Sequence, residues 1–325
     1  MVTRNLIPTI PYLSFILFLC LSHSALANKC LFISSYHTGY EWSDRVELGL
    51  RNTLQGQCEI KQFDMDTKRH KDEASIKQAA LNAKAIIDEW QPDVVITADD
   101  NAAKYIIATH YRDASIPFVF CGINWSIDEY EFPYTNTTGI VEVAPIGLLL
   151  VKAMNILGEV DSAVYIGADT LTERKNLQRF ATAAHDFDIT LKSHLVSTSS
   201  DWMKAYKAAQ NHDFLIIGSH SGINDWDNTD IKEFVRTHTR RLSATNHGWM
   251  LPYTILGFTK VPEEHGVWAG RAAIAILNGA RPNDIPIASN RKWDLLINDV
   301  IVKSSGIEIP DTLARTAKKT SEQKR

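Results

Sequence analysis

The sequence predicts an α/β protein built from two doubly wound, Rossmann-like parallel sheets. The first observation is a set of continuous apolar runs that end abruptly in small or polar residues, as in 92–101 and 116–124. Uninterrupted apolar runs of this length are typical of strands that are buried on both faces. The second observation is that helical apolar stripes separate these runs. The third is that the alternation of strand and helix starts again after residue 143, which indicates two lobes.

The first lobe is predicted to contain five strands with helices between them. We expect strands at 29–34 and 58–64, in the apolar runs that start at 92 and 116, and at 139–143. Helices are expected from Ser43 and from Asp72, because both are favourable N-cap residues and apolar side chains recur at helical spacing after each. A shorter helix at 102–111 should connect the third and fourth strands.

The second lobe repeats this alternation. Apolar stripes predict helices within 146–157, 177–184, 202–209 and 231–238, and apolar runs predict strands at 163–167, 189–196, 214–218 and 248–255. One helix at 263–277 and one apolar run at 294–297 follow, which are too few elements for a third domain. They must be added to the two lobes already built, so the chain is expected to cross between lobes more than once.

These crossings give the expected division of the chain. The first lobe takes residues 28–142 and 256–285, and the second takes residues 143–255 and 286–313. Residues 314–325 are expected to form a flexible basic tail. Two lobes also suit the length, because about 150 residues per domain is a usual size.

The first 27 residues are predicted to be a secretory signal peptide. They begin with the charge of Arg4, continue with a short apolar core at 13–21 and end in Ala25-Leu26-Ala27. The alternative is a membrane anchor, but the core has nine residues, whereas about 20 are needed to span a bilayer. We therefore expect cleavage after Ala27 and a periplasmic location.

The charge balance argues against a nucleic-acid partner. The chain holds 34 Lys and Arg against 38 Asp and Glu, whereas domains that bind nucleic acid are usually strongly basic. Three cysteines follow the predicted leader. Cys30 and Cys58 open two strands that should be neighbours, which leaves a disulfide open without fixing its geometry, and Cys121 ends a buried strand.

Motifs for catalysis or cofactor binding are absent from the sequence. It contains no G-x-G-x-x-G after a strand, no G-x-x-x-x-G-K-[ST], no H-E-x-x-H and no G-x-S-x-G. The cysteine spacings do not fit a zinc site. We therefore predict no catalytic residue, no cofactor and no metal, and a secreted enzyme is the weakest of the functions considered.

The candidate binding residues follow the predicted strands, because ligands of doubly wound sheets bind just beyond the carboxyl ends of the strands. This rule, with two residues near the crossovers, selects Ser35, Tyr36, His37, Tyr40, Trp42, Asp99, Asp100, Asn101, Asn124, Glu142, Asp169, Thr170, Ser219, His220, Ser221 and Tyr253. Several of them have structural alternatives: helix capping for Asp99 and Asn101, and packing under a helix for Trp42. For Glu142 the alternative is a hydrogen bond at a hinge.

These loops favour a ligand that carries an amine. They hold four carboxylates and several aromatic rings, with no Lys or Arg in the strand-end loops that supply them. Buried carboxylates need cationic or donor partners, and aromatic faces attract cations. We expect an amino acid or a related amine rather than a phosphate or a simple anion. The alternative is a neutral ligand, with the acids acting as helix caps.

Several segments together resemble one known family. They are 34–44 (SSYHTGYEWSD), 99–102 (DDNA), 117–124 (PFVFCGIN), 270–273 with 276–279 (GRAA, ILNG), 284–286 (DIP) and 297–298 (IN). In this order they resemble the ABC-transporter substrate-binding proteins of the type I periplasmic binding protein fold, over nearly the whole chain after the leader. The resemblance implies two α/β lobes, three crossover segments and a ligand enclosed by hinge motion. The first loop differs from that of members that bind aromatic amino acids, so the ligand is not implied.

Two functions fit this resemblance. The first is a periplasmic solute-binding protein, monomeric and without catalysis, that captures a small ligand for an ABC permease. The second is the same fold used as a sensor that signals to a membrane kinase or cyclase. Both need only a closure that depends on ligand, so the sequence does not separate them.

Overall fold

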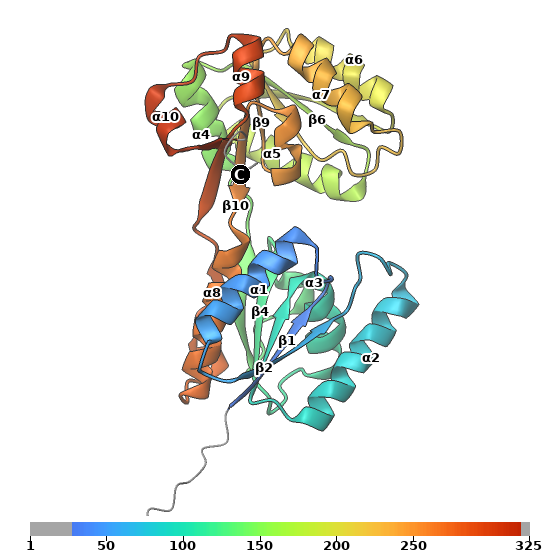
Figure 1. Ribbon diagram of the computed structural model, residues 1–325, viewed down its shortest axis with the longest axis vertical. Helices are drawn as coiled ribbons and strands as arrows, with labels where there is room; N and C mark the ends of the chain where they lie inside the picture. The colour runs from blue at the N-terminus through green and yellow to red at the C-terminus, as the bar shows by residue number, and fades with distance from the viewer. Residues whose placement is uncertain (1–27, 320–325) are drawn as a thin grey trace, which may run out of the picture.

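The computed structural model describes residues 28–319 as two α/β lobes that lie end to end (Figure 1). The N-terminal strands belong to the lower lobe in this view, and the chain passes between the lobes along β10 (Leu256–Lys260) and its neighbours. Residues 1–27, for which a signal peptide is predicted, lie outside the described residues, as do residues 320–325. Within residues 28–319, no helix is both long enough and apolar enough to cross a membrane.

The first lobe is built on a six-stranded parallel sheet with the order β11-β5-β4-β3-β1-β2. Its strands are β1 (Lys29–Ser34), β2 (Glu59–Asp64), β3 (Val94–Ala98), β4 (Phe118–Asn124), β5 (Thr137–Glu142) and β11 (Ala288–Ser289). The central strands β1, β3 and β4 are buried at almost every residue, as their continuous apolar runs predict. The edge strand β2 is more exposed and its sequence is correspondingly mixed.

Helices cover both faces of this sheet. On one face lie α1 (Glu41–Leu54) and α8 (Pro262–Leu277), and on the other lie α2 (Glu73–Trp90), α3 (Asp99–Ala102) and the π-helix η1 (Ala103–Ala108). Asp72 caps α2 as expected, because its carboxylate accepts a hydrogen bond from the amide of Ser75 at 2.9 Å. The start of α1 differs from the expectation. It begins two residues before Ser43, which is buried within the first turn.

The second lobe is built on a seven-stranded sheet with the order β13-β12-β10-β9-β8-β6-β7. Its other strands are β6 (Ser162–Ala168), β7 (Thr190–Val196), β8 (Phe214–Ile217), β9 (Leu242–Thr245), β12 (Trp293–Ile297) and β13 (Lys318–Lys319). Only the β10–β12 pair is antiparallel among the described strands. The helices are α4 (Ile146–Leu157), α5 (Leu171–Asp186), α6 (Ser199–Ala209), α7 (Asn228–His238), α9 (Asp299–Ser305) and α10 (Asp311–Thr316), around one core.

In the described part of the chain, three connections join the lobes. They run from β5 to α4, from β10 to α8 and from β11 to β12. This arrangement confirms the predicted class, two doubly wound lobes with three crossovers. It also orients the sheets. The carboxyl end of β5 leads into the second lobe and the carboxyl end of β10 leads into the first, so the carboxyl edges of the two sheets face each other.

Two segments lie in the other lobe from the one expected. Residues 256–260 were assigned to the first lobe, but they form β10, which pairs with β9 and β12 in the second sheet. Residues 288–289 were assigned to the second lobe, but they pair with β5 at the edge of the first sheet. The second and third crossovers therefore lie a few residues later in the chain than the apolar pattern suggested, whereas the first follows Glu142 as expected.

Two elements near the carboxyl end also differ from the expectation. The strand expected at 248–255 is the 3-10 helix η3 (Gly248–Tyr253), which contains Pro252. Proline cannot donate to a strand ladder, which disfavours a central strand here. The basic tail is ordered as far as residue 319, because β13 pairs with β12 and the ammonium of Lys318 lies 2.7 Å from the carboxylate of Asp294.

Cys30 and Cys58 form a disulfide, with their Cα atoms 5.9 Å apart. The pairing of β1 with β2 brings the two residues to neighbouring positions, which answers the question that the sequence left open. Cys121 is free and buried in β4, as expected. Two short 3-10 helices, η2 (Asp128–Tyr130) and η4 (Pro282–Asp284), complete the described elements.

Candidate functional site

The first half of the candidate site lies at the carboxyl edge of the first sheet. The loops after β1 and β2 are joined there, because the amides of residues 65–67 donate to the carbonyls of residues 34–36 at 2.9, 3.0 and 3.0 Å. This contact brings the ammonium of Lys68 to 4.2 Å from the ring centroid of Tyr36 and 5.1 Å from that of Tyr40. A cation from the neighbouring loop therefore stands beside loops that by themselves contain no Lys or Arg.

Two of the predicted binding residues make hydrogen bonds within the first lobe. The hydroxyl of Ser35 is fully buried, donates to the carbonyl of Ala98 at 2.6 Å and accepts from the amide of Ala102 at 2.9 Å. The amide side chain of Asn101 donates to the hydroxyl of Thr67 at 2.8 Å. Both residues join β1, the loop after β2 and the start of α3, so they fix the shape of the edge.

Asp99 is the most unusual residue of this edge. It is 3% exposed, has a φ of 69°, and accepts a hydrogen bond from the indole N–H of Trp42 at 3.0 Å. Its other oxygen, Oδ2, is buried and has no hydrogen-bond partner among the described residues. Burial raises the pKa of Asp99 well above its ordinary value, and the charges of Glu142 and Asp100 act in the same direction.

Asp100 has its acceptor oxygens occupied. One oxygen accepts from the hydroxyl of Tyr130 at 2.8 Å, and the other accepts from the side-chain amide of Asn124 at 2.6 Å. These bonds hold the end of β4 and the following turn against α3. We interpret Asp100 and Asn124 as a support for the edge, while the unpartnered oxygen of Asp99 is the acceptor that the neighbouring protein groups leave open.

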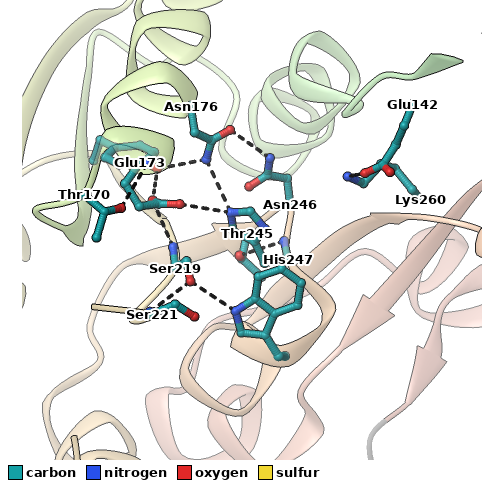
Figure 2. A network of polar contacts seen from close by, with 12 residues as sticks. Glu142, Thr170, Glu173, Asn176, Ser219, Ser221, Thr245, Asn246, His247 and Lys260 are labelled. Atoms are coloured by element: carbon teal, nitrogen blue, oxygen red, sulfur yellow. Dashed lines mark hydrogen bonds and ion pairs between the residues drawn. The ribbon is translucent and has the colours of Figure 1, made fainter. Parts of the chain in front are cut away.

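Glu142 and Lys260 form a largely buried ion pair at the crossovers (Figure 2). They are the last residues of β5 and β10, and their side chains are 7% and 20% exposed. The ammonium of Lys260 also lies 5.4 Å from the ring centroid of Trp42. Beneath Trp42 lies His265, whose ring nitrogens have no partner within residues 28–319. Burial, with the charge of Lys260 nearby, lowers the pKa of His265 to about 3.

The second half of the site is organised around the buried carboxylate of Glu173 (Figure 2). Glu173 accepts from the hydroxyl of Tyr165 and from the amide of Ser219, the latter at 3.0 Å, and lies 3.5 Å from a ring nitrogen of His247. The side chain of Asn176 continues the network, since it donates to the hydroxyl of Tyr165 at 2.9 Å. The network joins α5, β6 and the ends of β8 and β9.

Two glycines make room for this carboxylate. A Cβ atom on Gly167 would lie 2.7 Å from Oε2 of Glu173, and one on Gly218 would lie 2.2 Å from the same oxygen. Glycine at both positions, without a Cβ atom, therefore leaves room for the carboxylate of Glu173. From the sequence, Glu173 resembles the acid of a capping box, because it comes three residues after the N-cap Thr170. Its side chain instead points toward the sheet.

The network ends in side chains that reach the surface. Trp249 is 53% exposed, its ring stacks on that of His247 with centroids 4.6 Å apart, and its indole N–H donates to the hydroxyl of Ser219 at 3.3 Å. The amide of Ser221 donates to the same hydroxyl at 3.0 Å. We call Ser219, Ser221, His247 and Trp249 the second-lobe edge, and Tyr36, Tyr40, Trp42, Lys68 and Asp99 the first-lobe edge.

The remaining predicted residues of the second lobe have local partners. Asp169 pairs with Arg174, and the hydroxyl of Thr170 caps α5. The ring of His220 stacks on Trp226 with centroids 4.6 Å apart. Tyr253 is 2% exposed and accepts from the indole of Trp226 at 3.2 Å, which makes it a core residue in this arrangement. His37 lies near Tyr40, and its Nδ1 is 3.0 Å from the carbonyl of Thr38.

Sequence reasoning missed Lys68, Lys260, Glu173, His247 and Trp249. Lys68 follows β2 and Lys260 is the last residue of β10, so a stricter use of the strand-end rule finds them. His247 and Trp249 follow β9, a strand of four residues with a mixed sequence that no apolar run indicates.

A separate cavity of about 480 Å³ lies between α9, α10 and β13, with Ile297, Val302 and Ile309 in its wall, and it contains none of the predicted site residues.

The comparisons with known proteins agree with this geometry. The family model described as ABC transporter substrate binding protein matches residues 43–321. A ligand-free, open substrate binding protein with adhesive properties from Clostridium difficile is 13% identical, covers 90% of this chain and 99% of its own, and has a TM-score of 0.74. The ABC domain from Streptococcus pneumoniae in complex with L-Trp is 14% identical at the same coverage, with a TM-score of 0.60. No curated protein matches the chain.

The fold and its facing carboxyl edges define the class: the chain has the type I periplasmic binding protein fold. Because the family model spans most of the sequence, the protein belongs to the family of ABC transporter substrate binding proteins. Proteins of this family bind small-molecule ligands and work with an ABC permease. The family model and the similar structure from Clostridium difficile are both described as substrate binding proteins.

Proposed function

We propose that this protein captures an amino acid between its two lobes in the periplasm and delivers it to an ABC permease. The observation that carries the proposal is the buried Asp99, whose Oδ2 has no partner among the described residues, on an edge that also holds Tyr36, Trp42 and Lys68. The ammonium of a ligand would supply the partner that this oxygen lacks. A sensor would use the same closure, and no contact in residues 28–319 favours that role over transport.

Charges of both signs favour an amino acid over a simple amine. Glu142 forms an ion pair with Lys260, and Asp100 accepts a hydrogen bond from the hydroxyl of Tyr130. Both carboxylates therefore already have partners within the protein. Lys68 adds a cation to the first-lobe edge. A zwitterion suits such an edge, because its ammonium can donate a hydrogen bond to Asp99 while its carboxylate accepts from Lys68 or from the hydroxyl groups of the second-lobe edge.

The fold alone does not select the ligand. The similar structures include the L-Trp complex and a periplasmic ribose ABC transporter from Conexibacter woesei, which is 12% identical, covers 90% of this chain and 99% of its own, and has a TM-score of 0.56. The choice of an amino acid therefore depends on the charged and aromatic groups of the two edges. Its rival is a neutral ligand such as a sugar.

A thermal-shift screen tests the proposal. The purified protein is mixed in turn with the L-amino acids, with simple amines, with sugars and with phosphate, and its melting temperature is recorded. A ligand present at 100 times its Kd stabilises a protein by about 2.7 kcal/mol, which gives a shift of several degrees. At least one L-amino acid should raise the melting temperature. A rise with a sugar or phosphate alone would overturn the assignment.

Two variants locate the bound amino acid, one on each edge. Tyr40→Ala and Trp249→Ala should each reduce the shift produced by the active amino acid. Trp249 is half-exposed, so its removal should leave the melting temperature of the free protein nearly unchanged. Leu81→Ala is the control, because Leu81 is 49% exposed on α2 and belongs to neither edge. An undiminished shift in both site variants would place the ligand elsewhere.

A further inference from the structure

Each pair of crossovers between the lobes is tied by a side chain. The side chain of Asn290 accepts from the amide of Val143 at 2.7 Å and donates to its carbonyl at 3.2 Å, which joins the first crossover to the third. The carboxylate of Glu264 accepts from the amides of residues 291 and 292 at 2.9 and 2.7 Å, which joins the second crossover to the third. The pair of Glu142 with Lys260 joins the first crossover to the second.

Only one of these ties, as far as the described contacts go, reaches the first-lobe edge. Lys260 lies over the ring of Trp42, and Trp42 donates its indole N–H to Asp99. The other two ties end on backbone groups of the crossovers themselves. A change at Asp99 therefore acts on Trp42. A displacement of Trp42 acts on the ammonium of Lys260, and through it on the carboxylate of Glu142.

We infer that Lys260 is the positioning residue that links the first-lobe edge to the hinge. Its ammonium is shared between Glu142, at the end of one crossover strand, and the face of Trp42, at the edge. When the contact of Trp42 with Asp99 changes, the position of Lys260 and the relative direction of β5 and β10 change with it. The inference deepens the proposed function and rests on it, because it assigns the step by which an occupied edge alters the angle between the lobes.

Lys260 transmits the movement because separating the ion pair of Lys260 with Glu142 costs free energy. Removing one partner of a buried ion pair leaves an uncompensated charge and is strongly unfavourable. Lys260 therefore stays with Glu142 whenever Trp42 moves, and the movement is passed to the strands that carry both residues. A pair exposed to water would not transmit it, because exposed ion pairs are weak and readily separate.

The test measures the distance between the lobes without any ligand. Cysteines introduced at Lys77 on α2 and Lys232 on α7 carry nitroxide labels, and electron–electron resonance gives the distance distribution. Both positions are exposed, while the native Cys121 is buried and the other two cysteines are bonded to each other. The labels are first placed in four proteins, namely the parent chain, Trp42→Phe, Lys260→Met and the double variant, and then in the Lys260→Arg and Glu264→Gln backgrounds with and without Trp42→Phe.

Trp42→Phe keeps an aromatic ring and removes the N–H that Asp99 accepts. It should shift or broaden the distance distribution in the parent chain but cause no further change in the Lys260→Met background. Lys260→Arg, which keeps the charge, should restore the response to Trp42→Phe. An unchanged distribution in Trp42→Phe, or an equal change with and without Lys260, would overturn the inference.

Glu264→Gln is the matched control, because it weakens a different tie of the same hinge. Trp42→Phe should still change the distances in that background. Melting temperatures confirm that each variant is folded, and a structural role of Lys260 alone would lower them without removing the response to Trp42→Phe. Because no ligand is added, a failed amino-acid screen and a failed distance test are separate results.

Discussion

Asp99 combines three features that are individually uncommon. Its carboxylate is buried, one oxygen lacks a partner among the described residues, and its backbone is in the left-handed region. A residue in that region costs about 1–3 kcal/mol and persists only where its surroundings impose it. The sequence pattern gives the position of Asp99 at a strand end, but its hydrogen bond comes from Trp42, which lies 57 residues away in the chain.

The raised pKa of Asp99 gives the first prediction at this scale. In the unfolded chain the carboxyl group of Asp99 has a pKa near 3.8. Below this pH the group is protonated in both the folded and the unfolded state, and its contribution to the free energy of unfolding is complete. As the pH rises toward the folded pKa, that contribution is lost by about 1.4 kcal/mol per pH unit. Asp99→Asn cannot ionise, still accepts from Trp42 and tolerates the backbone angle. The free energy of unfolding of Asp99→Asn should therefore gain on that of the parent chain as the pH rises above the unfolded value of 3.8.

Asp113→Asn is the matched control for this experiment. Asp113 also has a positive φ, of 53°, but it is exposed, and hydrogen bonds from Thr135 lower its pKa. Stability from such a group is present above the unfolded pKa and is lost as the pH falls. The two variants should therefore diverge from the parent chain in opposite directions in urea unfolding curves. Parallel curves for Asp99→Asn and the parent chain would show that Asp99 is ionised in the folded protein.

At the scale of elements, the close pairing of α1 with α8 was not predictable from periodicity. The sequence shows Gly266 and Gly270 on an Ala-rich helix, which suggests a close approach to some neighbour but does not identify it. The structure identifies α1. A Cβ atom on Gly266 would lie 1.9 Å from the carbonyl oxygen of Val46, and one on Gly49 would lie 2.3 Å from the carbonyl oxygen of Glu263. Helices that meet backbone to backbone require glycine at the contact.

Gly266→Ala should therefore destabilise the first lobe strongly. The clash is with helix backbone, which cannot rotate away as a side chain can, so α8 must move from α1. We expect a loss of about 3 kcal/mol in the free energy of unfolding, at the upper end of the usual cost of overpacking. Urea unfolding followed by circular dichroism measures it.

Gly248→Ala separates this effect from the loss of a glycine as such. A Cβ atom on Gly248 would meet no other heavy atom within 4 Å, and the backbone there is not left-handed. The expected change is within about 0.5 kcal/mol of the parent chain. Equal losses in the two variants would mean that helix contact is not what constrains Gly266.

At the scale of the whole molecule, the sequence predicts the number of lobes and the crossovers better than it predicts the site. Strand and helix patterns are local, so the alternation that defines both lobes can be found along the chain. The partners of the site are not local. Lys260 meets Glu142 across 118 residues, and His247 meets Glu173 on a different element. Such pairs follow from the order of strands in the sheets, which the sequence pattern leaves open.

One contact between the lobes is made by two side chains that lie outside the three crossovers. Trp125 follows β4 of the first lobe, has a φ of 65° and packs against the core of the second lobe. The guanidinium of Arg179 on α5 lies over its ring, 4.0 Å from the centroid. Burial lowers the pKa of Arg179. Cation–π contacts contribute about 0.5–2 kcal/mol, more when they are desolvated.

The last prediction concerns this contact. In a double-mutant cycle, Trp125→Leu and Arg179→Gln should each lower the free energy of unfolding, and their combined loss should fall short of the sum by about 1 kcal/mol. The pair of Arg112 with Tyr134 is the control, because its centroid distance is 4.8 Å and both residues lie in the first lobe.

Hydrogen exchange then separates the two cycles. Loss of the Trp125 contact should speed exchange at amides of α5 in the second lobe, whereas loss of the Arg112 contact should affect the first lobe alone. Strictly additive losses for Trp125 and Arg179 would mean that the lobes are held in register by the three crossovers and not by this contact.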